Sequence, residues 1–231
     1  MAGRQSVLIV GAGSGLSASL TRLGAREGMA VTLAARNVDK LAALAKETGA
    51  KVVACDAADP AAVARLFAET DRAGTPDWVV YNASGRARGP IGELDPEAVR
   101  QAVLVSSYGA FLVAQQAATR MIARGSGSIF FTGASASVKG YARSSAFAMG
   151  KFAQRGLAQA LARELAPQNI HVAHFVIDGG IGKANHKRAE GKGPDALLDP
   201  DAIAETYLAI HRQHRSAWTW EVELRPWVEN F

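Results

Sequence analysis

Val10-Gly11-Ala12-Gly13-Ser14-Gly15-Leu16-Ser17 is the stretch of sequence that decides the fold. It follows the continuous apolar run of residues 6–10 and opens residues 14–27, where leucines recur at helical spacing. Glycines between a strand and a helix let the backbone approach a pyrophosphate, which the free N–H groups and positive dipole end of the helix then bind. The stretch therefore predicts a dinucleotide-binding turn. The expected contacts are Gly11, Gly13, Ser14, Gly15 and Leu16.

Outward from this turn, short apolar runs alternate with longer helical patterns along the whole chain. We expect strands at residues 6–10, 30–35, 51–54, 77–81, 128–132, 170–177 and 217–224, and helices at residues 14–27, 38–48, 60–72, 97–123, 145–166 and 201–212. Most of these strands are continuously apolar, which favours a parallel sheet covered on both faces. The prediction is an α/β fold of the Rossmann type: a doubly wound, parallel, seven-stranded sheet in a single domain, residues 1–231.

Composition excludes several other classes of protein. With 231 residues, 48% hydrophobic and 20% charged, the chain has too many apolar residues for disorder. Cys55 is the only cysteine, which excludes a disulfide framework. No run of about 18 residues is apolar and uncharged enough to span a membrane, and the apolar run at residues 6–10 is too short for a signal peptide. We therefore expect a cytoplasmic protein.

The net charge of +5 comes from basic residues that are scattered along the chain rather than gathered in a run. This distribution does not favour a nucleic-acid partner. No set of histidines and cysteines has the spacing of metal ligands, so no metal site is expected.

Four further features are similar to the short-chain dehydrogenase/reductase family. The spacing of glycines in residues 11–15 resembles the family fingerprint Gly-xxx-Gly-x-Gly, with Ser17 in place of the third glycine. Asp56 closes the third expected strand, where the family places an Asp that meets the adenine. Asn82-Ala83-Ser84-Gly85 follows the fourth strand and resembles the family's Asn-Asn-Ala-Gly turn, and Lys151 lies in the corresponding helix. The resemblance covers nearly the whole chain.

This resemblance implies an oxidoreductase with a nicotinamide cofactor and a small-molecule substrate. It implies further cofactor contacts from Asp56, Ala57, Asn82, Ala83, Ser84, Lys151 and Ile181. NAD-preferring members carry an acidic residue near Ala35, but none stands here. Arg36 instead offers a planar cation for a 2′-phosphate, so we expect Arg36 and Asn37 to favour NADP(H). The alternative is that Arg36 is an exposed arginine that caps a helix.

The expected catalytic residues depart from the family pattern. In the family, Tyr of a Tyr-xxx-Lys motif gives a proton to the carbonyl oxygen, Lys holds the nicotinamide ribose and a Ser orients the carbonyl. Here the motif is Phe147-Ala148-Met149-Gly150-Lys151, and a phenyl ring has no proton to give. The usual spacing places the Ser at Ala134, so Ser135 or Ser137 would serve after a local shift.

Another group must then donate the proton. The candidates are Tyr141, Ser135, Ser137 and a water molecule held by Lys151, although Tyr141 could equally be an ordinary surface aromatic residue. Asp178, where relatives carry a proline, is either a base beside the nicotinamide or the cap of a turn.

Three functions remain open at this point: an NADP(H)-dependent oxidoreductase for a carbonyl or alcohol, a non-catalytic NADP(H)-binding sensor or scaffold, and a non-redox lyase or isomerase. Residues 179–200 are long, irregular and glycine-rich, which favours a substrate lid. The resemblance also implies a homodimer or homotetramer that associates through the helices at residues 97–123 and 145–166.

Overall fold

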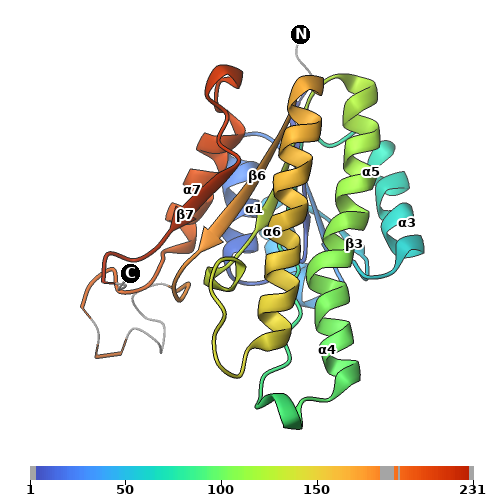
Figure 1. Cartoon of the computed structure of the whole chain (residues 1–231). Coiled ribbons are helices and arrows are strands. Elements are labelled where there is room, and N and C mark those ends of the chain that lie inside the picture. The colour runs from blue at the N-terminus through green and yellow to red at the C-terminus, as the bar shows by residue number, and fades with distance from the viewer. Residues whose placement is uncertain (1–3, 183–189, 192, 229–231) are drawn as a thin grey trace.

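Seven parallel strands form one sheet in the computed structural model, which describes residues 4–182, 190–191 and 193–228 (Figure 1). The strands are β1 (Ser6–Val10), β2 (Ala30–Ala35), β3 (Lys51–Ala54), β4 (Trp78–Tyr81), β5 (Gly127–Thr132), β6 (Ile170–Ile177) and β7 (Glu221–Leu224). Their order is β3-β2-β1-β4-β5-β6-β7. The direction of winding reverses between β1 and β4, which is the point where doubly wound sheets bind ligands.

Helices cover both faces of this sheet. They are α1 (Leu16–Arg26), α2 (Ala42–Thr48), α3 (Pro60–Asp71), α4 (Pro96–Val103), α5 (Gly109–Arg124), α6 (Ser145–Leu165) and α7 (Pro200–His211). Figure 1 shows α5 and α6 side by side on the near face, with α1 and α7 behind the sheet. Alternate residues of a strand point to opposite faces: Leu8 joins the core under α3, α5 and α6, and Ile9 joins the core under α1, α2 and α7. The predicted fold class is confirmed.

Three of the helices begin in the same way, with an aspartate followed by a proline. Asp59, Asp95 and Asp199 each accept hydrogen bonds from backbone N–H groups of the first helical turn. Proline suits the first position because its missing N–H would have no partner inside the helix. These local sequences set where α3, α4 and α7 start.

The helix expected at residues 97–123 is present as unbroken helical backbone over residues 96–124, but it is not an α-helix throughout. Between α4 and α5 the chain makes a π-helical turn over Leu104–Tyr108, which widens the helix by one residue per turn. The hydroxyl of Tyr81 in β4 donates to the Val105 carbonyl, and Nε2 of Gln154 in α6 donates to the Ser106 carbonyl at 3.1 Å. The partners come from distant segments, so a helical pattern within residues 97–123 does not reveal the turn.

Two other boundaries differ from the sequence prediction. The strand expected at residues 217–224 is confined to β7, because Trp218 leaves the strand path, stacks on His171 at 4.7 Å and donates its indole N–H to the Gln213 carbonyl. The helix expected at residues 38–48 starts with a 3₁₀ turn, Asp39–Leu41, before α2.

Of the segment expected as a lid, residues 179–200, the structure describes residues 179–182, 190–191 and 193–200. An isolated bridge pairs Ile181 with Leu198, and the Leu198 N–H donates to the Gly180 carbonyl at 2.9 Å. Residues 183–189 and 192 lie outside the described residues, so the lid stays a prediction. Among the helices that the structure describes, none has the length and apolar character needed to cross a bilayer.

Candidate functional site

Two neighbouring cavities open at the carboxyl ends of the strands. The first, which we call the glycine-turn cavity, has a volume of about 360 Å³ and lies between the turn after β1 and the ends of β2 and β3. The second, which we call the Lys151 cavity, has a volume of about 500 Å³ and is lined by segments after β4, β5 and β6 together with the start of α6. Asn82 and Ser84 line both cavities, so the two share a wall.

Gly11 fixes the shape of the glycine turn. Its φ of +86° lies in the left-handed region, and a Cβ there would stand 2.3 Å from the backbone nitrogen of Ala83. Only glycine fits both conditions. Gly13 and Gly15 differ, because a Cβ at either position would meet no atom within 4 Å. The turn therefore packs tightly against the end of β4 and leaves open space next to the start of α1.

Ser17 ties this turn to the end of β4. Its hydroxyl donates to the Gly11 carbonyl at 3.2 Å and accepts from the side-chain amide of Asn82 at 2.8 Å. The residue that stands in place of the third glycine is thus buried and hydrogen-bonded.

Most predicted cofactor contacts meet in the glycine-turn cavity. Its lining includes the predicted residues Gly11, Arg36, Asn37, Asp56, Ala57, Asn82, Ala83 and Ser84. The predicted contacts Gly13, Ser14, Gly15 and Leu16 do not line either cavity; Gly15 is the N-cap of α1 and Leu16 its first, buried residue. Lys151 and Ile181 line the second cavity instead.

Sequence reasoning missed one cation in this cavity. Lys40 lines it together with Arg36, and both side chains are exposed. The 3₁₀ turn that carries Lys40 starts where the Asn37 side chain accepts the Asp39 N–H at 3.1 Å. Lys40 could have been predicted from the sequence because it follows Arg36 by four residues. Cys55 also lines the cavity, and burial raises the pKa of its thiol to about 11.

Lys151 is the buried cation of the second cavity. Its ammonium donates to the Thr132 carbonyl at 2.6 Å and to Oε1 of Gln154 at 3.1 Å, which leaves one of its three N–H groups for a ligand. Burial, and secondarily the charge of Arg86, lowers the pKa of Lys151 to about 7. The helix α6 can pass close to the π-turn because Gly150 has no side chain. A Cβ at this position would stand 2.6 Å from the Ser106 Cβ.

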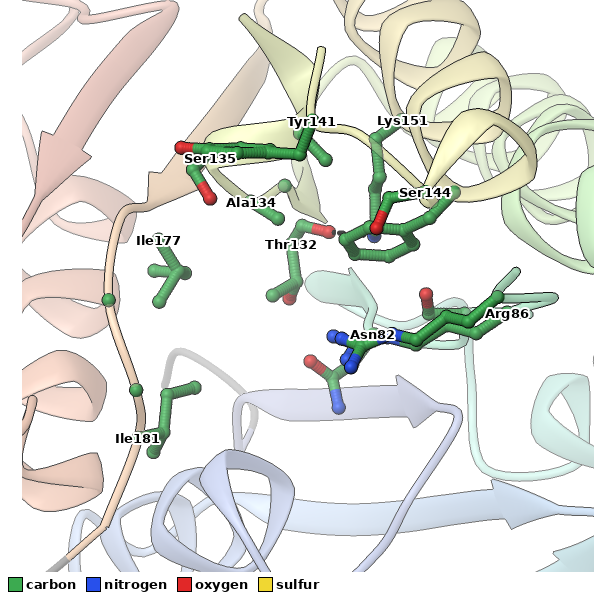
Figure 2. A pocket seen from close by; sticks show the side chains of 17 residues that line it. Asn82, Arg86, Thr132, Ala134, Ser135, Tyr141, Ser144, Lys151, Ile177 and Ile181 are labelled. Atoms are coloured by element: carbon green, nitrogen blue, oxygen red, sulfur yellow. Dashed lines mark hydrogen bonds between the residues drawn. The ribbon is translucent and has the colours of Figure 1, made fainter. Parts of the chain in front are cut away.

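Arg86 is the second residue that sequence reasoning missed. Figure 2 shows Arg86 and Lys151 entering the same cavity from different sides, with Thr132 beside the end of Lys151 and Ile177 and Ile181 on another wall. The Arg86 guanidinium lies 4.3 Å from the centre of the Phe147 ring. Phe147 is buried and lines the cavity, so its phenyl group serves as a platform for a cation.

The candidate proton donors divide into two groups. Ser135 and Tyr141 line the Lys151 cavity, and Tyr141 is half exposed. Ser137 does not line it: the side chain is fully buried and its hydroxyl accepts the Ala134 N–H at 3.1 Å. Ser144, at the start of α6, also lines the cavity and was not predicted.

The surroundings of Asp178 do not favour a role as a catalytic base. Its carboxylate is buried and accepts a hydrogen bond from the Lys139 ammonium at 3.2 Å, and it does not line the Lys151 cavity. His174, inside β6, is also buried and bonds to Glu221 at 3.0 Å; burial lowers the pKa of its imidazole to about 4. The described residues contain no group of three or more His, Cys, Asp or Glu placed to hold a metal ion.

Residues 5–191 match the family model described as short chain dehydrogenase. The chain belongs to the short-chain dehydrogenase family. The D-threitol dehydrogenase of Mycolicibacterium smegmatis is 28% identical over 197 residues, which span 82% of this chain and 75% of that relative. A crystal structure of a short-chain dehydrogenase from Rhodopseudomonas palustris is 33% identical with a TM-score of 0.83, over 96% of this chain and 99% of that one.

A metagenomic short-chain oxidoreductase solved in complex with NADP is 27% identical with a TM-score of 0.83, over 97% of this chain and 98% of that one. Membership of the short-chain dehydrogenase family confirms the expectation of an oxidoreductase family. The position of Phe147 relative to the family's tyrosine, and the role of each site residue, remain predictions.

Proposed function

We propose that this member of the short-chain dehydrogenase family is an NADP(H)-dependent oxidoreductase that interconverts a carbonyl compound and an alcohol without a tyrosine at position 147. The observation that carries the proposal is the shared wall of the two cavities. One cavity holds Arg36 and Lys40, the other holds Lys151, and Asn82 lies between them. A dinucleotide is long enough to occupy both.

The residues of the glycine-turn cavity fit NADP(H). The tight packing at Gly11 and the open space beside Gly13 and Gly15 suit a pyrophosphate at the start of α1. Arg36 and Lys40 provide two cations for a 2′-phosphate next to the end of β2, where no carboxylate stands to bind the ribose hydroxyls of NAD(H). When bound, the cofactor supplies or accepts the hydride.

Lys151 has two functions in this proposal. Its remaining N–H binds a ribose hydroxyl or a water molecule, and its pKa of about 7 makes proton exchange with that water easy at neutral pH. In the reducing direction the cofactor would supply the hydride, and the held water would give its proton to the carbonyl oxygen while it takes one from the Lys151 ammonium, which regains a proton from solvent. Ser135 orients the substrate from the segment after β5.

Tyr141 is the competing proton donor, because it lines the same cavity. A Tyr141→Phe variant separates the two sources. If the water held by Lys151 donates, the variant keeps its rate within a few-fold; if Tyr141 donates, the rate falls by about 10²-fold or more.

Titration with NADPH and then NADH, followed by nicotinamide fluorescence, tests the cofactor proposal. We expect Arg36→Ala to weaken NADPH binding by about 10- to 100-fold and to leave NADH binding nearly unchanged, because only NADPH carries the 2′-phosphate. Arg163→Ala, which removes an exposed arginine of α6 that lines neither cavity, is the matched control. Absence of binding to either nucleotide would overturn the proposal.

A second candidate function is a non-catalytic NADP(H)-binding sensor or scaffold. The observation that favours it is Phe147, which lines the Lys151 cavity and has no proton to donate. A Phe147→Tyr variant distinguishes the two functions in assays with NADPH and a broad panel of carbonyl compounds. Reduction by the wild-type protein supports the enzyme, whereas NADPH binding by a wild-type protein that reduces none of the compounds supports the sensor, with or without a gain of activity in the variant. No observation favours a lyase or isomerase that uses Asp178, since that carboxylate pairs with Lys139.

We further propose that copies of the chain associate through α5 and α6, as a homodimer or homotetramer. Five large apolar side chains remain exposed on these helices and on the π-turn: Tyr108, Phe111, Ile122, Met149 and Phe152. Light scattering after size exclusion tests this. A double variant, Phe111→Glu with Phe152→Glu, is expected to be monomeric, and an unchanged mass would contradict the proposed interface.

A further inference from the structure

We infer that the Lys151 cavity binds a substrate that carries a carboxylate or phosphate group, held by Arg86 and Arg88. The inference rests on the proposed oxidoreductase function and adds the chemical class of its substrate. It follows from the charge of the cavity, the way the chain directs the two arginines into it, and the platform under Arg86.

The charge of the cavity is positive. Arg86, Arg88 and Lys151 line it, and none of the described lining residues is acidic. Asp178 lies in sequence between two lining residues, but its carboxylate faces Lys139 at 3.2 Å. A cavity lined by one sign of charge attracts ligands of the opposite sign and disfavours ligands of the same sign.

Arg86 and Arg88 both line the cavity, although the residue between them does not. Residues 82–88 form no regular element, and Ala87 is buried in a small cluster with Ala102 of α4 and Ala146 of α6. Packing of Ala87 in this cluster anchors the segment next to the cavity, and Figure 2 shows the Arg86 side chain reaching into it.

Arg86 is held where it can contact a ligand. Its guanidinium lies over the face of the Phe147 ring at 4.3 Å, and this stacking holds the side chain in the lining of the cavity. The paired N–H groups of an arginine match the two oxygens of a carboxylate or phosphate. Arg86 and Lys151 also repel each other, which an anion bound near both would relieve.

The same anion chemistry could come from the cofactor rather than the substrate. The glycine turn and the pair Arg36 and Lys40 already provide contacts for the cofactor phosphates in the other cavity. The substrate is therefore the favoured source, and the experiment must separate the two.

A pair of aldehydes that differ only in charge tests the inference. We expect NADPH-dependent kcat/KM for 4-carboxybenzaldehyde to exceed that for its methyl ester by about 10- to 100-fold. In Arg86→Met and Arg88→Met variants this ratio falls toward one, because kcat/KM for the acid falls more than kcat/KM for the ester. Arg143→Met is the matched control, because Arg143 lies near this segment through its carbonyl bond to Gly89 but does not line the cavity.

Binding measurements make the outcome independent of turnover. Calorimetric titration with benzoate and with benzamide, with and without NADP⁺, should show benzoate binding that Arg86→Met weakens at least tenfold and Arg143→Met does not. If the protein neither binds nor oxidises NADPH but still binds benzoate, the proposed oxidoreductase function is overturned and the anion site is not. Three results would each overturn the anion site. They are equal binding of benzoate and benzamide, an acid-to-ester ratio that neither arginine variant alters, and arginine variants that weaken only NADPH binding.

Discussion

The two cavities share Asn82 and Ser84, yet they differ in how the chain builds them. The glycine-turn cavity is formed by the ends of β1, β2, β3 and β4 and the turns that follow them, with Val105 of the π-turn as the one described lining residue from elsewhere. The Lys151 cavity gathers residues from the segment after β4, the end of β5, the loop before α6, α6 itself and the segment after β6.

This difference teaches what a local motif can determine. A turn such as residues 11–15 consists of consecutive residues, so the ligand that it suits can be predicted from the local sequence. Arg86 and Lys151 stand far apart in sequence and meet only because β4 and β5 are neighbours in the sheet. The following predictions separate the two cavities by experiment, from the largest expected effect to the smallest.

Removal of the Lys151 ammonium should damage chemistry far more than cofactor binding. We expect Lys151→Met to lower the rate of 4-carboxybenzaldehyde reduction by about 10²- to 10⁴-fold, because the proton source and the ribose contact are both lost. The dissociation constant for NADPH should rise by less than about tenfold, since the glycine-turn cavity is untouched. Steady-state kinetics and fluorescence titration give the two values. Lys46→Met, on the exposed side of α2, is the control, and equal losses in rate and affinity would contradict the separation.

The glycine turn should be sensitive at one position and tolerant at another. Gly11→Ala places a Cβ against Ala83 and forces alanine into a left-handed φ, so we expect the free energy of unfolding to fall by about 2–4 kcal/mol. Gly13→Ala meets no neighbouring atom and should change it by less than about 0.5 kcal/mol. Urea denaturation measures both. Similar losses for the two variants would show that the turn does not depend on this contact.

The pH dependence of NADPH binding should report on Lys151. Its folded-state pKa of about 7 is depressed, so the free protein loses this proton as the pH rises through 7. An anionic cofactor raises the pKa and so draws a proton in on binding. Affinity should therefore fall above about pH 7, by at most about tenfold per pH unit, in the wild type. Lys151→Met should lack this decline, and an identical pH profile in both proteins would exclude Lys151 as its source.

Lys40 should have the smallest effect, because its side chain is exposed and screened by solvent. We expect Lys40→Met to weaken NADPH binding by about two- to fivefold at low salt, with NADH binding unchanged. The difference should disappear at high ionic strength. An equal effect on both nucleotides would mean that Lys40 does not contact the 2′-phosphate.

The sequence predicted the sheet because continuous apolar strands and helical spacing are local signals. It predicted that Arg36 belongs to the glycine-turn cavity because this prediction needs only the identity of one residue after β2. It did not predict the π-turn at Leu104–Tyr108, which depends on hydrogen bonds from Tyr81 and Gln154. Arg86 was missed for the same reason: its stacking on Phe147 joins two segments that only the folded sheet brings together.

Cys55 gives this chain a practical property. A thiol reacts as its thiolate, and with a pKa of about 11 only about one thiol in 10⁴ is ionised at neutral pH. Since it is the sole cysteine and is buried, a cysteine introduced on the exposed surface of α5 or α6 would be alkylated far sooner. Fluorescent dyes could therefore be attached at a chosen site of the native chain, and energy transfer between dyes would test whether copies of the chain associate through α5 and α6.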